Sequence, residues 1–115
     1  MNLMSLQDAL QLLVGKHITS VEFHEHFLRI KIEDARIRIN GELELILHDS
    51  SLKTGSPGFK DELCRHIGEH VLSVAILGPT YFVLMKNGTS LRIEPDPRLG
   101  PNASELQIQN RTWPL

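Results

Sequence analysis

The stretch FKDELCRHIGEHVLSVAILGPTYFVLMKNGTSLRI, residues 59–93, decides the fold because it repeats LQDALQLLVGKHITSVEFHEHFLRIKIEDARIRI, residues 6–39. The two segments align with one single-residue gap, and their apolar positions coincide. Eight aligned pairs are identical: Asp8 with Asp61, Leu10 with Leu63, Gly15 with Gly68, His17 with His70, Ser20 with Ser73, Val21 with Val74, Arg38 with Arg92 and Ile39 with Ile93. We therefore expect two copies of one structural unit.

A chain of 115 residues suits one domain, so the two repeats are expected to share a core. We assign residues 5–48 to the first repeat and 59–110 to the second. Residues 49–58 between them are rich in Ser, Gly, Thr and Pro and are interpreted as a connector. The prediction is a single domain over 1–115.

Each repeat is predicted to open with a short helix. Ser5 is a typical N-cap, and Gly15 follows the apolar stripe as a stop. In the second repeat Ser56 comes before the helix, Pro57 takes a first-turn position, and Gly68 ends the helix. Helices of two or three turns are marginal alone in water, so both must pack on another element.

That element is a sheet. Residues 16–23 and 69–77 are rich in β-formers, and a hairpin follows each. Asn87-Gly88 favours a two-residue turn that pairs Val83 with Arg92, and the turn Glu33-Asp34 pairs Ile30 with Ile37. A fourth strand is expected at 42–45 and at 105–108. The fold class is α+β and strand-rich: two repeats of a short helix plus an antiparallel β-meander, as one barrel-like sheet or as two layers.

The first hairpin is predicted to carry four cations on its outer face, with Arg29 opposite Arg38 and Lys31 opposite Arg36. Like charges placed directly opposite each other disfavour strand pairing. Two interpretations stay open. Neighbouring glutamates could neutralise the cations in a solvated lattice, or the face could bind phosphate or the carboxylates of an acidic protein.

The same register places Tyr81, Val83 and Met85 on the outer face of the second hairpin. An exposed apolar face of this kind is either covered by another part of the chain or used as an interface. Both interpretations stay open for these three residues: a homodimer interface, or burial under another part of the same chain.

Metal and catalytic sites are not expected. His24 and His26 could supply two ligands, and two ligands do not make a site. His17 and His70 occupy equivalent positions, for which a buried structural role is favoured over a pH-sensitive pair. Cys64 is interpreted as a core thiol rather than a nucleophile. No phosphate loop or zinc-protease motif occurs, so no cofactor and no enzyme activity are predicted.

A net charge of −2 argues against nucleic acid as a partner, and a single cysteine excludes an internal disulfide. The sequence contains no apolar run long enough to suggest a membrane segment, so a cytoplasmic protein is expected.

The opening Leu13-Val14-Gly15-Lys16-His17-Ile18-Thr19-Ser20-Val21, with a similar unit at 67–74, resembles a family of small bacterial proteins of unknown function that contain an internally duplicated β-rich unit. Proteins of this type look similar to immunity or accessory proteins of bacterial conflict loci. The resemblance implies no activity.

The functional prediction is therefore a non-catalytic bacterial interaction protein of immunity or accessory type, acting through a protein partner or self-association. The alternative is a binder of a small phosphate-bearing, nucleotide-like ligand that uses the basic hairpin face.

Overall fold

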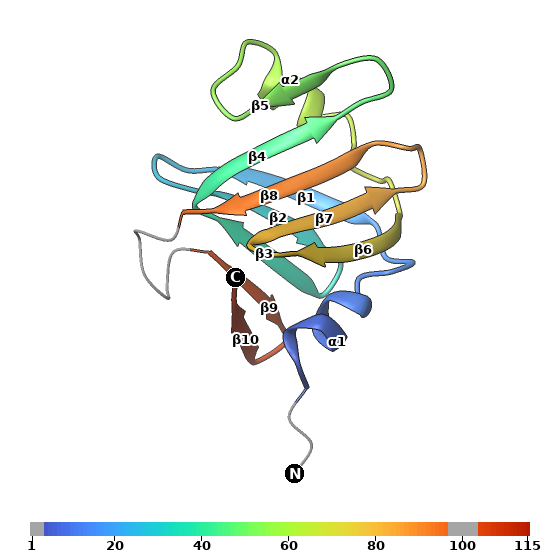
Figure 1. Ribbon diagram of the computed structural model, residues 1–115, viewed down its shortest axis with the longest axis vertical. Coiled ribbons are helices and arrows are strands. Elements are labelled where there is room, and N and C mark those ends of the chain that lie inside the picture. Colours follow the sequence, from blue (N-terminus) through green and yellow to red (C-terminus); the bar gives the residue numbers. More distant parts are fainter. Residues whose placement is uncertain (1–3, 97–103) are drawn as a thin grey trace.

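The computed structural model describes residues 4–96 and 104–115 (Figure 1). These residues form two helices, α1 (Leu6–Gln11) and α2 (Phe59–Cys64). They also form ten strands: β1 (Ile18–Phe23), β2 (Leu28–Ile32), β3 (Ala35–Ile39), β4 (Gly41–Ile46), β5 (Ser51–Lys53), β6 (Val71–Leu77), β7 (Thr80–Met85), β8 (Ser90–Pro95), β9 (Glu105–Ile108) and β10 (Arg111–Pro114). The predicted strand-rich α+β class is confirmed.

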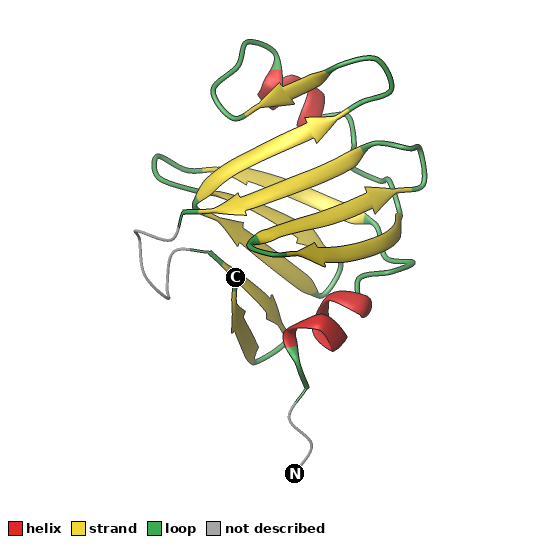
Figure 2. Ribbon diagram, in the orientation of Figure 1, coloured by secondary structure: helices red, strands yellow, loops and turns green. Residues whose placement is uncertain are grey.

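The strands form two five-stranded antiparallel sheets that face each other as two layers (Figures 1 and 2). We call them sheet 1, with the order β1-β2-β3-β9-β10, and sheet 2, with the order β5-β4-β8-β7-β6. Their inner faces share one hydrophobic core, to which Ile30 and Ile37 contribute from sheet 1 and Leu45 and Leu91 from sheet 2. A two-layer arrangement thus applies rather than a single sheet.

Each half of the chain contributes to both sheets. After β3 the chain crosses from sheet 1 to sheet 2, where β4 pairs with β8. After β8 it crosses back, and β9 pairs with β3. Each sheet is therefore built from three consecutive strands of one half and two strands of the other.

The two halves also meet through the backbone at the segments that precede β1 and β6. The Gly15 amide donates to the Val71 carbonyl at 2.9 Å, and the Val71 amide donates to the Lys16 carbonyl at 2.8 Å. In the same pattern, the Gly68 amide donates to the Ile18 carbonyl at 2.7 Å. Gly15 and Gly68 have φ values of +88° and +99°, which side-chain-bearing residues rarely adopt.

Each helix packs its buried apolar residues against a strand. α1 packs on β6 and α2 packs on β1, so each helix covers the first strand of the other half. The Ser5 hydroxyl accepts from the Asp8 amide at 3.1 Å, which confirms the predicted cap. α2 starts later than its sequence indicated, because Gly58 with φ +85° is its N-cap and Ser56 lies outside the helix.

The first hairpin has the predicted register. Ile30 pairs with Ile37, Leu28 pairs with Ile39, and all four are buried. The turn at residues 33–34 tolerates a left-handed Glu33, with φ +53°.

The predicted register of the second hairpin is wrong by one residue. Val83 pairs with Leu91 rather than with Arg92. The reason lies in the turn: Lys86, Asn87 and Gly88 form a three-residue loop that the Met85 amide closes by donating to the Thr89 carbonyl at 2.8 Å. Gly88 takes the left-handed conformation, with φ +93°, that such loops need.

A one-residue shift of a strand turns every side chain to the other face. Tyr81, Val83 and Met85 consequently point into the core, where they are 9%, 1% and 0% exposed. The prediction that these three residues form a homodimer interface is therefore wrong.

Two short strands were not predicted from the sequence: β5 in the connector and β10 in the tail. β10 brings the tryptophan to the N-terminal segment, where the Trp113 Nε1 donates to the Met4 carbonyl at 2.9 Å. The tail is thereby docked on the domain.

The Lys16–Asp34 ion pair, at 2.6 Å, ties the end of the first helical segment to the β2–β3 turn. The hydrogen bond from Lys16 lowers the pKa of Asp34. A lowered folded-state pKa stabilises the fold above the unfolded-state pKa of about 3.9, and this contribution is lost as pH falls through the folded value.

We expect Asp34→Asn to be slightly less stable than the parent protein at pH 7 and to differ less from it as the pH falls below about 4. Because Asp34 is 47% exposed, solvent screens the pair and the effect is small. Urea unfolding across this pH range measures it. An unchanged difference between the two proteins at every pH would contradict this linkage.

Candidate functional site: the cationic outer face of sheet 1

The four predicted cations do lie together on the outer face of sheet 1. The register pairs Arg29 with Arg38 and Lys31 with Arg36 across β2 and β3, as predicted. Alternation along both strands sends the intervening Ile30 into the core and leaves the cations outside. We call these four residues the cationic face.

Glutamates on the flanking strands neutralise one of the two pairs. Glu22 on β1 lies 3.3 Å from Arg29, and Glu105 on β9 lies 3.7 Å from Arg38. For this pair, the interpretation that neighbouring glutamates neutralise the cations applies. The arginines of this pair are about three-quarters buried, at 28% and 25% exposed, so they are held in place.

The other pair has no such neutralisation. Lys31 lies opposite Ser20 on β1, and Arg36 lies opposite Gln107 on β9, so neutral residues occupy the places where glutamates flank the first pair. Within residues 4–96 and 104–115, neither Lys31 nor Arg36 forms an ion pair. Two like charges therefore face each other on adjacent strands with their charge available to a ligand.

An aromatic cluster closes the end of the face at the β1–β2 loop. His24 stacks on Phe27 with ring centroids 4.3 Å apart. The guanidinium carbons of Arg29 and Arg38 lie 5.5 Å and 6.0 Å from the Phe27 centroid, within cation–π range. Phe27 thus helps to fix both arginines.

The pKa of Glu22, the carboxylate that pairs with Arg29, is lowered. A hydrogen bond from His24 at 3.2 Å lowers the pKa of Glu22, and the positive charges of Arg29 and Arg36 lower it further.

The outer face of sheet 2 differs in character. The second hairpin exposes Phe82 and Leu84 in place of Arg29 and Lys31. Arg92, the counterpart of Arg38, pairs with both Glu44 and Glu94. Unneutralised cations are thus found on sheet 1 and not at the matching positions of sheet 2.

The histidines do not form a metal site in the part of the chain that the structure describes, since no three candidate ligands cluster there. His24 bonds Glu22, and His26 lies 3.8 Å from Glu25 on an exposed loop. The predicted burial of His17 and His70 is wrong.

His17 and His70 meet instead at the surface, where the two halves of the chain join. Their ring centroids are 5.3 Å apart, and the His17 side chain is 41% exposed. The His17 Nδ1 lies 3.0 Å from a Glu33 carboxylate oxygen, which gives this junction a polar anchor. Cys64, also expected in the core, is exposed.

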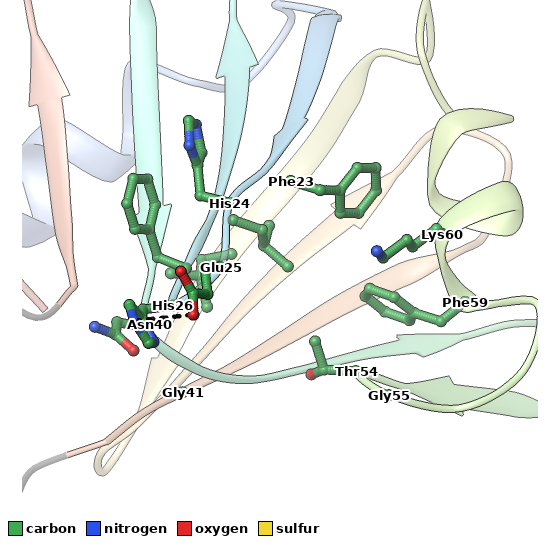
Figure 3. Close-up of a pocket in the computed structure, with 13 residues that line it drawn as sticks. Phe23, His24, Glu25, His26, Asn40, Gly41, Thr54, Gly55, Phe59 and Lys60 are labelled. Carbon is green, nitrogen blue, oxygen red and sulfur yellow. Dashed lines mark ion pairs between the residues drawn. The ribbon is translucent and has the colours of Figure 1, made fainter.

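A hollow adjoins the cationic face at the β1–β2 loop (Figure 3). Its volume is about 250 Å³, and it is lined by residues of three segments: 23–28, 39–41 and 54–60. No sequence motif links these segments, so the hollow could not be predicted, and only the folded chain brings them together.

No family model, curated protein or solved structure matches this chain. The resemblance to small bacterial proteins of unknown function therefore stays a prediction. Neither helix in the described residues is long and apolar enough to cross a bilayer.

Proposed function

We propose that this protein is a non-catalytic binding protein that docks an acidic surface of a partner protein on its cationic face. The observation that carries the proposal is the pair Lys31 and Arg36, two cations placed directly opposite each other with neutral residues beside them. Such a pairing costs stability in the free protein, and carboxylates of a partner would offset that cost.

The shape of the face favours a macromolecule. The cations are spread over two adjacent strands in the middle of the open outer side of sheet 1, and the hollow lies at its end rather than beneath it. Small ligands are usually bound in concave sites, whereas flat surfaces suit protein partners. An interaction protein of immunity or accessory type would need a surface of this kind.

A second candidate is a small phosphate-bearing, nucleotide-like ligand. The observation in its favour is Phe27, whose ring lies beside Arg29 and Arg38. An aromatic ring can stack on a base while guanidinium groups hold a phosphate.

The test measures binding of a fluorescent glutamate-rich peptide by anisotropy at low salt. Arg36→Glu is expected to weaken binding at least about tenfold, because it replaces an attraction by a repulsion at the centre of the face. Lys86→Glu is the matched control: it makes the same charge change in the exposed β7–β8 turn of sheet 2.

Equal losses in Arg36→Glu and Lys86→Glu would show a general effect of net charge and would count against the proposed face. The phosphate-bearing alternative is examined by competition with ATP and pyrophosphate. If ATP displaces the peptide at micromolar concentration, and does so only in proteins that retain Phe27, the second candidate takes precedence.

A further inference from the structure

The hollow beside the cationic face has the composition of a small-molecule site. It opens between the β1–β2 loop, the β3–β4 crossover and the segment that enters α2 (Figure 3). Buried apolar side chains form its base: Leu28, Ile39 and Phe59 are 5%, 2% and 2% exposed. Phe23, at the end of β1, adds a second, partly buried ring. A ligand would therefore meet two aromatic rings and an aliphatic floor.

One exposed side chain, Lys60, brings a full positive charge to the edge of this apolar surface. The Lys60 ammonium lies 5.3 Å from the centroid of the Phe23 ring. Figure 3 shows it directed into the hollow between the rings of Phe23 and Phe59. The ring attracts the ammonium but does not neutralise it. Lys60 forms no ion pair with any residue in the described ranges.

Other polar side chains that line the hollow already have partners of their own. The Thr54 hydroxyl accepts from the Leu43 amide at 2.9 Å and lies 3.1 Å from the Leu43 carbonyl, to which it donates. Glu25 pairs with His26 at 3.8 Å, and both are more than three-quarters exposed. The single Lys60 ammonium thus matches a single carboxylate, because the Glu25 carboxylate that also lines the hollow works against any further negative charge.

We propose that this hollow binds a small monocarboxylate whose body is a single aromatic ring. The carboxylate would pair with the Lys60 ammonium, and the ring would pack on Phe23 and Phe59. The volume of about 250 Å³ lies below the usual range of drug-sized sites, which limits the ligand to a compact molecule. This inference does not depend on the cationic face, since none of those four residues lines the hollow.

The experiment is an NMR titration of the full ¹⁵N-labelled chain with 3-phenylpropionate and, separately, with its neutral amide. The acid is expected to shift amide signals in 23–28 and 54–60, and to bind at least about tenfold more tightly than the amide, because the charged pair is made by the acid alone. Lys60→Met keeps the aliphatic stem and should weaken binding of the acid at least about tenfold while leaving binding of the amide unchanged.

Lys86→Met is the control for loss of a lysine elsewhere and should bind the acid like the parent protein. Lys60→Arg keeps the charge and should retain the preference for the acid even if Lys60→Met proves unstable. The proposal is overturned if acid and amide bind equally, if neither shifts these signals at millimolar concentration, or if the acid shifts Arg29, Lys31, Arg36 and Arg38 instead. The last result would assign the ligand to the cationic face.

Discussion

Replacing Gly41 by alanine is expected to lower the free energy of unfolding by about 3 kcal/mol, the largest loss we expect from the addition of one methyl group. Gly41 starts β4 where the chain crosses between the sheets, and it pairs with Pro95. An added Cβ would overlap the Glu94 carbonyl oxygen and would approach the Asp96 amide to 2.7 Å. Both are backbone atoms, so no side-chain rotation relieves the contact.

Gly55→Ala is the matched control, because Gly55 also has a positive φ, +88°, but has nothing within 4 Å of an added Cβ. It should lose only the conformational cost of about 1 kcal/mol. Urea unfolding of both variants separates steric overlap from backbone strain. Equal losses of unfolding free energy in the two variants would mean that the backbone near Gly41 moves to accept the methyl group, so that the close approach has no energetic cost.

Introducing a carboxylate at Val83 is expected to unfold the protein or to cost at least about 4 kcal/mol, since Val83 is 1% exposed and lies between Val74 and Leu91 on the neighbouring strands. Leu84→Asp, one residue along the same strand, should cost about 1 kcal/mol because that side chain points outward. Circular dichroism and thermal unfolding measure both.

This pair of variants tests the register directly, because the register predicted from the sequence reverses the order. If Val83→Asp folds and Leu84→Asp does not, β7 faces the other way. Should Val83→Asp give no soluble protein, Val83→Ala provides a measurable loss of about 2 kcal/mol.

The sequence predicted the elements whose determinants are local. Ser5 and Gly15 delimit the first helical segment, and alternation of cations with Ile30 and Ile37 sets the faces of the first hairpin. The cationic face could be predicted because two adjacent strands and a short turn suffice to define it.

The register of the second hairpin was predicted wrongly because a single gap in the alignment could be placed in two positions. The predicted alignment opened its gap before residue 81. In the structure β7 and β8 are joined by the three-residue turn Lys86–Gly88, whereas β2 and β3 are joined by a two-residue turn. Both placements keep an apolar pattern, because β7 is apolar on both faces. Only the outer residues Phe82 and Leu84 distinguish them, and their partial exposure depends on tertiary packing.

The hollow could not be predicted for a different reason. Phe23, Asn40 and Lys60 come from segments that share no motif, and the crossover at Gly41 decides how they meet. The pairing of Lys60 with Phe23 is a consequence of packing α2 against β1.

The crossing of the chain between the sheets makes the whole chain the unit of folding. Sheet 1 is incomplete until β9 reaches β3, and Leu106 then pairs with Ile37 across most of the chain's length. Closing so large a loop has an entropic cost that must be met before those contacts form. Neither half can close its own side of the core, so a break in one half deprives the other of two strands. Each half depends on the other for two strands of its sheet, as the subunits of a strand-exchanged dimer do.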